Sequence, residues 1–181
     1  MPINVGLVGC GVIGTEIAKA IDSGVIDANL VAVCDHNAAS AEALIESLKK
    51  RPVRAGLEEL VELSDVVVEA ASQRAVPSIA RAALRKGRRL MIMSVGALTD
   101  AALLEEVTRL AQAHGSQVFL PSGAISGVDG LKSASIGKIR RITLTTTKNP
   151  RSLAGAPYIV ENNIDLGSLA GVEALFGVVD A

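Results

Sequence analysis

Short apolar runs and helical patterns alternate along residues 1–121 of the chain. The apolar runs are rich in Val, Ile, Leu and Ala, a composition typical of strands that helices cover on both faces. Gly87 marks a helix end, while Asn37 and either Thr99 or Asp100 are expected to cap the starts of two helices. Strands are expected near residues 3–8, 30–34, 52–54, 65–70, 88–95 and 117–121, and the helices between them include residues 38–50, 57–63, 76–86 and a last one that ends at Ala113.

Six strands that alternate with helices predict a doubly wound parallel α/β sheet, the Rossmann fold, over residues 1–121. Past Pro121 the pattern changes. A glycine-rich loop leads into a short helix, and residues 139–148 alternate as a half-covered strand would. A helical pattern follows at residues 168–176. One strand and one helix cannot close a domain, so residues 122–181 are expected to form an incomplete α+β substrate domain.

The start of the chain carries the pattern of a dinucleotide-binding loop. An apolar strand leads directly into Gly9, Gly11 and Gly14, which have the spacing Gly-x-Gly-x-x-Gly. In this pattern the first glycine permits a tight turn, the second lets the backbone approach the pyrophosphate, and the third lets helix and strand pack closely. The backbone N–H groups of Val12 and Ile13, at the start of the following helix, are then expected to bind the phosphates.

Asp35 completes this pattern, because it ends the second apolar run and follows Gly14 by 21 residues (35 − 14). An acid about 20 residues past the last glycine is expected to bind the ribose hydroxyls. Its carboxylate favours NAD, since it repels a 2′-phosphate, but it does not exclude NADP. The alternative is a glycine turn that binds nothing, and the complete order of strand, glycines, helix, strand and acid argues against it.

Small residues follow the fourth, fifth and sixth predicted strands, at residues 70–73, 94–98 and 121–125. The carboxyl ends of parallel strands meet at one edge of the sheet, so these segments are expected to converge beside the nucleotide. Ala71 and Ser72 are the cofactor contacts expected there, where they leave room for a nicotinamide ring. The alternative is that these segments are ordinary turns.

Composition narrows the classes of function. The chain is 49% hydrophobic but 2% aromatic, so an aliphatic core is expected, and its net charge of −1 gives no indication of a nucleic-acid partner. No apolar run reaches the roughly 20 residues of a membrane span, so a cytoplasmic protein without a membrane partner is expected. Cys10 and Cys34 are expected to be free buried thiols, and no spacing typical of a metal site is present.

A dehydrogenase also needs a group that moves a proton as hydride is transferred. His36 is expected near the adenosine end of a nucleotide, and His114 at a helix end on the opposite edge of the sheet. Lys132, Lys148 and Asp129 are the remaining candidates, and a lysine near the cofactor could bind a dicarboxylate substrate. Solvated surface lysines are the alternative.

Five segments are more specific than the fold alone requires: residues 9–14, 68–76, 93–98, 121–131 and 145–150. They resemble the L-aspartate dehydrogenase family, and the resemblance extends to about Phe176. The loop after Pro121 is its most specific part. It implies oxidation of L-aspartate to iminoaspartate with NAD or NADP, a product that can feed NAD biosynthesis, and a contact of Ala124 with the nicotinamide end.

The resemblance also implies a departure, because members of the family continue past the length of this chain. The histidine that acts in their catalysis has no counterpart here, so the catalytic residue is expected to lie beyond the chain and turnover to be impaired by truncation. Two alternatives stay open at this point: a non-catalytic dinucleotide-binding module, and a related homoserine-type dehydrogenase. An uncovered sheet in the second domain would favour a homodimer.

Overall fold

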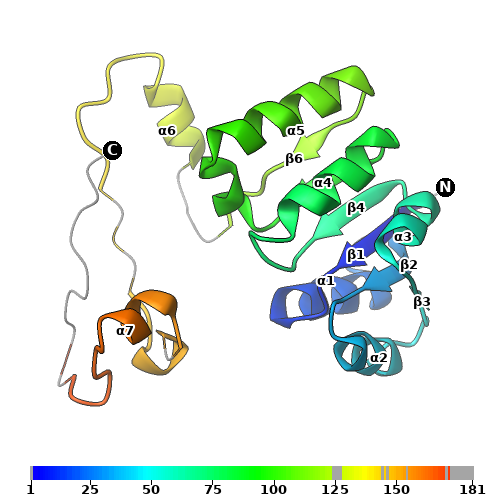
Figure 1. Cartoon of the computed structure of the whole chain (residues 1–181), viewed down its shortest axis with the longest axis horizontal. Helices are drawn as coiled ribbons and strands as arrows, with labels where there is room; N and C mark the ends of the chain where they lie inside the picture. Colours follow the sequence, from blue (N-terminus) through cyan, green and yellow to red (C-terminus); the bar gives the residue numbers. More distant parts are fainter. Residues whose placement is uncertain are drawn as a thin grey trace. The chain divides into compact units, whose positions relative to one another are not determined.

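The computed structural model describes residues 2–123, 128–143, 145, 147–153, 155–169 and 171. The chain forms two compact units, Met1–Val128 and Asp129–Ala181 (Figure 1). The domain boundary expected between residues 121 and 122 stays a prediction, because compactness alone does not show where one function ends and another begins.

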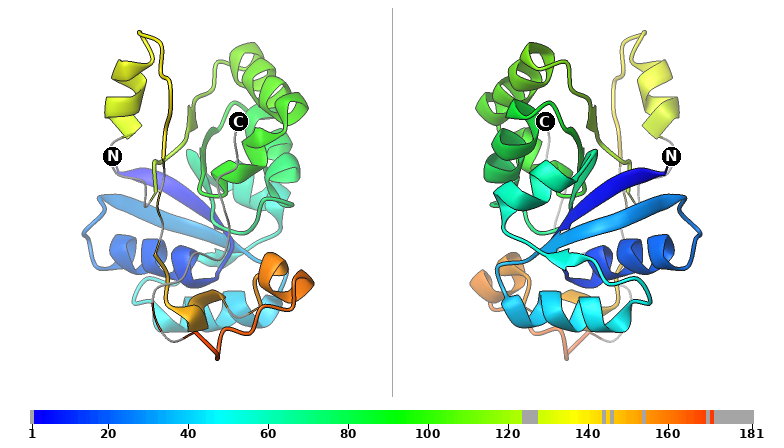
Figure 2. Two further views of the ribbon diagram at one scale, coloured as in Figure 1. Left: turned by 90° about the vertical axis from the view of Figure 1, so that its left-hand side faces the viewer. Right: turned by 90° about the vertical axis from the view of Figure 1, so that its right-hand side faces the viewer.

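The first unit is built on a six-stranded sheet in which every neighbouring pair of strands is parallel (Figures 1 and 2). Its order is β3-β2-β1-β4-β5-β6, which confirms the doubly wound fold. The order reverses between β1 and β4, so the carboxyl ends of these two strands form the crevice where such sheets bind ligands. The strands are β1 (Ile3–Val8), β2 (Ala28–Cys34), β3 (Val53–Arg54), β4 (Val66–Glu69), β5 (Arg89–Ile92) and β6 (Val118–Phe119).

Helices cover both faces of this sheet, as the apolar strands predict (Figure 2). Helices α1 and α2 pack on one face, and α3, α4 and α5 pack on the other. A short 3-10 helix, η1 (Val95–Thr99), follows β5. The α-helices are α1 (Val12–Asp22), α2 (Ala38–Ser47), α3 (Leu57–Leu63), α4 (Val76–Arg85) and α5 (Ala101–Ala113).

Neighbouring side chains of the central strands enter two aliphatic cores, one on each face of the sheet. In β1, Leu7 packs with Ala18 of α1, while its neighbour Val8 belongs to the core that contains Leu60 of α3 and Ile79 of α4. Side chains of this kind contribute about 1.5–3 kcal/mol each when fully buried. The two cores therefore fix the register of the strands, because a shift by one residue would exchange the faces.

Local signals in the sequence set the ends of several helices. The Asn37 side chain accepts a hydrogen bond from the Ala39 N–H at the start of α2, and Gly87 adopts a φ of +67° just past α4. Asp100, rather than Thr99, caps α5. Both the caps and the C-terminal glycine were predictable, because they depend on residues next to each other in the chain.

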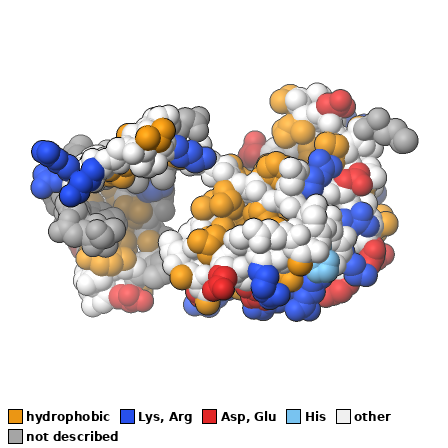
Figure 3. Space-filling view, turned by 90° about the horizontal axis from the view of Figure 1, so that it is seen from above, with side chains coloured by type: hydrophobic (Ala, Val, Ile, Leu, Met, Phe, Trp, Pro, Cys, Tyr) orange, Lys and Arg blue, Asp and Glu red, His pale blue; other side chains and the backbone are white. Residues whose placement is uncertain are grey.

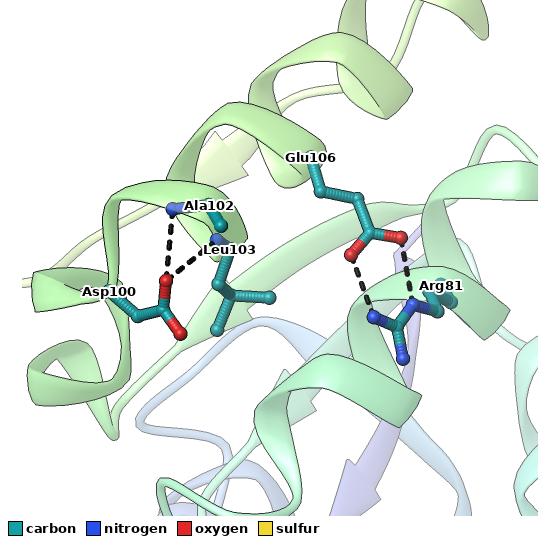
Figure 4. A network of polar contacts seen from close by, with 5 residues as sticks. All are labelled: Arg81, Asp100, Ala102, Leu103 and Glu106. Carbon is teal, nitrogen blue, oxygen red and sulfur yellow. Dashed lines mark hydrogen bonds and ion pairs between the residues drawn. The ribbon is translucent and has the colours of Figure 1, made fainter.

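Two polar contacts hold α5 in place (Figure 4). The Asp100 carboxylate accepts hydrogen bonds from the N–H groups of Ala102, at 2.9 Å, and Leu103, at 3.3 Å. Arg81 of α4 donates two hydrogen bonds to the two carboxylate oxygens of Glu106, at 2.8 and 2.7 Å. This ion pair raises the pKa of Arg81 and lowers that of Glu106, mainly through the hydrogen bonds between them. Because it is exposed to solvent, it contributes less to stability than the cap.

Asp100→Ala is expected to lower the free energy of unfolding by about 1 kcal/mol, the usual cost of a lost N-cap. Urea unfolding followed by circular dichroism measures this change. Asp100→Asn is the matched control, since an asparagine side chain also accepts from the first-turn N–H groups, and it is expected to unfold close to the wild type. Equal losses for both variants would contradict a capping role.

The described residues after residue 127 include three short helical segments, α6 (Val128–Ala134), η2 (Pro150–Leu153) and α7 (Pro157–Glu161). The short helix expected after the glycine-rich loop is present as α6. The strand expected at residues 139–148 is wrong for the part of that range that the structure describes, which has no regular structure. The alternation of side chains at residues 139–148 is typical of a strand, but a strand also needs a neighbouring strand that pairs with its backbone. All six strands of the described chain belong to the first unit. The helical pattern at residues 168–176 falls mostly outside the described residues.

Candidate functional site

The loop after β1 needs glycine at its first position for reasons internal to the protein. Gly9 adopts a φ of +102°, which L side chains rarely adopt, and a Cβ there would overlap with the Ala70 carbonyl. Its N–H donates a hydrogen bond of 2.8 Å to the Cys34 carbonyl oxygen. Gly9 therefore joins the carboxyl ends of β1, β2 and β4 at the switch point.

The other two glycines have different roles. A Cβ on Gly14 would overlap with the Gly9 carbonyl oxygen, so α1 packs against the loop only with glycine at this position. Gly11, by contrast, has no protein atom apart from its chain neighbours within 4 Å of the place where a Cβ would be. Protein packing does not require glycine there. The open space instead fits a group that approaches the backbone from outside, as a pyrophosphate does in this fold.

The N-terminus of α1 is open to an anion. Gly11 is its N-cap and offers no side chain to the first N–H groups, and the first turn contains no acidic residue. Val12 and Ile13 are exposed by 82% and 53%, so the first turn of the helix lies at the surface. The positive end of an 11-residue helix dipole therefore faces solvent, which favours binding of a phosphate.

Asp35 lies directly beside this loop. Its Oδ2 accepts a hydrogen bond of 2.7 Å from the Cys10 N–H, and its Oδ1 accepts one of 2.8 Å from the Asn37 N–H. The side chain is 9% exposed, and the Nδ1 of the exposed His36 lies 3.0 Å from Oδ1. Each carboxylate oxygen can accept two hydrogen bonds, so the acid can hold the glycine-rich loop and still bind ribose hydroxyls.

The other predicted site residues fall into four groups. Ala71 and Ser72 are exposed and follow β4, and Ala71 lies beside Gly9 as expected. His114 is the C-cap of α5, on the way into β6 and away from the carboxyl edge, which was also expected. Lys132 and Lys148 are exposed residues of the second unit. Ala124 and the side chain of Asp129 lie outside the described residues.

Sequence reasoning missed Glu69, the last residue of β4. Its side chain is fully buried and accepts three hydrogen bonds, from the N–H of Ala71 at 2.8 Å and from the N–H and hydroxyl of Ser94, both at 2.9 Å. The signal that could have found it is an acid at the end of the β-branched run Val66–Val68. The sequence pattern places this acid within a buried strand but does not indicate what it binds.

The two cysteines beside the glycine-rich loop are uncharged at neutral pH. Burial raises the pKa of Cys10 to about 11, with a smaller effect from the charge of Asp35, and burial also raises the pKa of Cys34. A neutral thiol next to a phosphate site adds no negative charge that would repel the ligand. Both cysteines are free, and Cys10 is buried as expected, whereas Cys34 is only partly buried because it ends β2 at the carboxyl edge of the sheet. The described residues include no cluster of acids, histidines and cysteines that could hold a metal.

Cys10 is expected to react with iodoacetamide about 100-fold more slowly in the folded chain at pH 8 than after unfolding in guanidinium chloride. The thiolate is the reactive form, and raising the pKa from 9.0 to about 11 lowers its fraction by that factor. Mass spectrometry of timed samples measures the rate at each cysteine. Equal rates in the folded and unfolded chain would contradict the buried, neutral thiol.

These features together fit a dinucleotide. The helix terminus and Gly11 suit its pyrophosphate, Asp35 suits a ribose, and the small residues after β4 leave room at the carboxyl edge. The roles of the individual residues stay predictions. In the part of the chain that the structure describes, no helix is both long and apolar enough to cross a bilayer.

Known families match both parts of the chain. Residues 9–121, more than half of its length, match the NAD-binding domain of homoserine dehydrogenase, and residues 129–177 match the C-terminal domain of aspartate dehydrogenase. The L-aspartate dehydrogenase of Methanocella arvoryzae is 52% identical over 92% of this chain and 62% of its own length. That of Methanococcoides burtonii is 48% identical over 96% of this chain and 65% of its own length. The chain belongs to the family of this NAD-binding domain, and over more than nine-tenths of its length it is similar to L-aspartate dehydrogenases.

These similarities confirm the resemblance to L-aspartate dehydrogenases that the sequence motifs indicated. The chain spans less than two thirds of the length of these two relatives. Solved structures agree on the fold: the biliverdin reductase of Synechocystis sp. PCC 6803 matches with a TM-score of 0.62 and 24% identity, over 78% of this chain and 45% of that one. At that identity the likeness shows the Rossmann fold alone.

Proposed function

We propose that this chain binds NAD or NADP and takes part in the oxidation of L-aspartate to iminoaspartate, a reaction that can feed NAD biosynthesis. The observation that carries the proposal is the glycine-rich loop. Gly9 and Gly14 are required by the surrounding protein, whereas the space beside Gly11 is open to a ligand. The L-aspartate dehydrogenases similar to this chain support the substrate.

Each part of the site has a separate task in this proposal. The first N–H groups of α1 bind the pyrophosphate, and Asp35 accepts hydrogen bonds from the hydroxyls of the adenosine ribose. The loops after β4 and β5 line the nicotinamide end, where the bound cofactor supplies a hydride acceptor. Small side chains such as Ala71 and Ser72 let the ring approach the carboxyl edge of the sheet.

We infer that neither histidine of the chain takes the proton that leaves the amino group of aspartate. His36 lies beside Asp35, on the adenosine side of β1, and His114 ends α5 away from the carboxyl edge. In this proposal the group that takes the proton is a residue other than His36 and His114. Proton transfer by a positioned side chain typically raises the rate of such a reaction by a factor of about 10²–10⁴.

We further propose a cytoplasmic homodimer in which a second copy covers the edge of the sheet at β6. An apolar groove of about 450 Å³ runs along α5 and β6 and includes Leu104, Val107 and Leu120. Hydrophobic side chains are visible on the face of the first unit drawn in Figure 3. An exposed edge strand beside apolar surface favours pairing with another chain. Light scattering after size exclusion measures the mass, and a monomer at micromolar concentration would contradict the dimer.

Two measurements test the function. Thermal unfolding with NADH present at 100 times its dissociation constant should show a stabilisation of about 2.7 kcal/mol. Reduction of NAD or NADP, followed at 340 nm with L-aspartate, should exceed the rate with D-aspartate or L-homoserine. Cofactor binding without any aspartate-dependent reduction would instead support a non-catalytic dinucleotide-binding module.

A further inference from the structure

The carboxylate of Glu69 ties together two loops at the carboxyl edge of the sheet. Its Oε1 accepts from the Ala71 N–H and the Ser94 hydroxyl, while its Oε2 accepts from the Ser94 N–H. A second contact joins the same loops, because the Gln73 side chain lies directly against Gly96, where a Cβ would be 2.5 Å from its Nε2. The segments that follow β4 and β5 thus form one connected surface.

Stability alone does not explain an acid at this position. Removing a carboxylate from water is costly, and an apolar side chain in a fully buried place would avoid that cost. Among the described residues no Lys or Arg forms an ion pair with Glu69. The hydrogen bonds from Ala71 and Ser94 therefore compensate for the cost of removing the carboxylate from water. What distinguishes the carboxylate from an apolar side chain is that it holds the two loops.

The order of the strands indicates which part of the cofactor these loops meet. The proposed pyrophosphate site follows β1, and the proposed ribose acid, Asp35, follows β2 on one side of it. A dinucleotide bound across the switch point must extend its other half toward β4 and β5, on the other side of β1. The loops held by Glu69 lie at this end.

We propose that Glu69 is a positioning residue for the nicotinamide half of the cofactor. It fixes Ala71 and Ser94 through their backbone N–H groups and does not itself touch the cofactor. This inference rests on the proposed function, since it assumes that a nicotinamide dinucleotide occupies the site.

Glutamine cannot replace Glu69 in this arrangement. A carboxylate offers two acceptor oxygens, and here the two backbone N–H groups approach different oxygens. The amide of glutamine has one oxygen and one NH₂ group, so in either orientation one backbone donor faces another donor. Glu69→Gln keeps the size and shape of the side chain but releases either the Ala71 loop or the Ser94 loop.

Titration calorimetry of the 181-residue chain with NADH and with ADP-ribose tests the proposal. ADP-ribose lacks only the nicotinamide ring, so the ratio of the two affinities reports the contribution of that ring alone. Glu69→Gln is expected to lower this ratio about tenfold or more, because small displacements of positioning groups have effects of that size. The affinity for ADP-ribose itself is expected to stay within about twofold, since the α1 terminus and Asp35 are unchanged.

Ser64→Ala is the matched control. Ser64 is also a buried polar residue, its hydroxyl donates to the Leu60 carbonyl oxygen, and it precedes β4 at the opposite edge of the sheet. This variant should lower stability without changing the affinity ratio. Ser94→Ala, which removes one of the three donors to Glu69 but keeps the backbone N–H, should lower the ratio by a smaller factor.

The outcomes separate the inference from the function on which it rests. An unchanged ratio in Glu69→Gln, or an equal fall in both affinities, overturns the positioning role while cofactor binding stands. If Glu69→Gln does not fold, the ratio in Ser94→Ala decides. A wild-type chain that binds NADH no tighter than ADP-ribose also overturns the inference, and one that binds neither ligand overturns the proposed function as well.

Discussion

Gly11→Ala is expected to lower the affinity for NADH by about 100-fold or more, with a loss of less than about 1 kcal/mol in the free energy of unfolding. The backbone at Gly11 has φ −75° and ψ −164°, which alanine adopts without strain, and no protein atom apart from its chain neighbours lies within 4 Å of the added Cβ. The methyl group would occupy the space through which the pyrophosphate approaches the loop. Isothermal titration with NADH and urea unfolding measure the two effects separately.

Gly56→Ala is the matched control for this substitution. Gly56 is also a helix N-cap, with φ −71° and ψ 167° and no side-chain cap, and only its chain neighbours lie within 4 Å of an added Cβ. It follows β3, which lies two strands away from β1 in the sheet. Its small loss of stability should match that of Gly11→Ala, while NADH binding stays unchanged. If Gly11→Ala binds NADH like the wild type, the cofactor does not use this loop.

Gly9→Ala should behave differently from both, because the surrounding protein itself requires glycine there. The φ of +102° and the overlap with Ala70 are expected to cost about 3 kcal/mol or more. Binding and stability would then fall together. The contrast between Gly9 and Gly11 distinguishes a glycine that serves the fold from one that serves the ligand.

Asp35→Ser is expected to weaken NADH binding by about tenfold or more and to remove most of the preference for NADH over NADPH. The substitution removes the acceptors for the ribose hydroxyls, and it also removes a negative charge that would repel a 2′-phosphate. A tenfold change in relative affinity corresponds to about 1.4 kcal/mol, well within the range for charges a few ångströms apart. Fluorescence titration with both reduced cofactors gives the ratio of affinities.

Asp22→Ser provides the comparison for lost backbone hydrogen bonds. The Asp22 carboxylate also accepts from two backbone N–H groups, those of Lys49 and Lys50 at 3.0 and 2.9 Å, and these bonds lower its pKa. It ends α1 at the opposite end of the helix from the glycine-rich loop. This variant should unfold more easily, yet keep the wild-type ratio of NADH to NADPH affinity. A changed ratio in Asp22→Ser would show that the effect at Asp35 is indirect.

The accuracy of sequence-based prediction differed between the two units for a physical reason. In the first unit every strand has a helix to cover it and a neighbour to pair with, so local patterns and the tertiary structure agree. The alternation at residues 139–148 has the same appearance in the sequence. Without a paired neighbour it does not form a strand over its described residues.

The sequence by itself determined the order of strands and helices, the glycine spacing and the acid after β2, because each depends on residues close together in the chain. It also indicated the family through motifs such as residues 121–131. The tertiary structure decided which glycines the protein needs and which are left for a ligand, since that depends on the atoms facing each Cα. It also decided the role of Glu69, because a buried carboxylate is defined by its donors, and Ser94 lies 25 residues further along the chain.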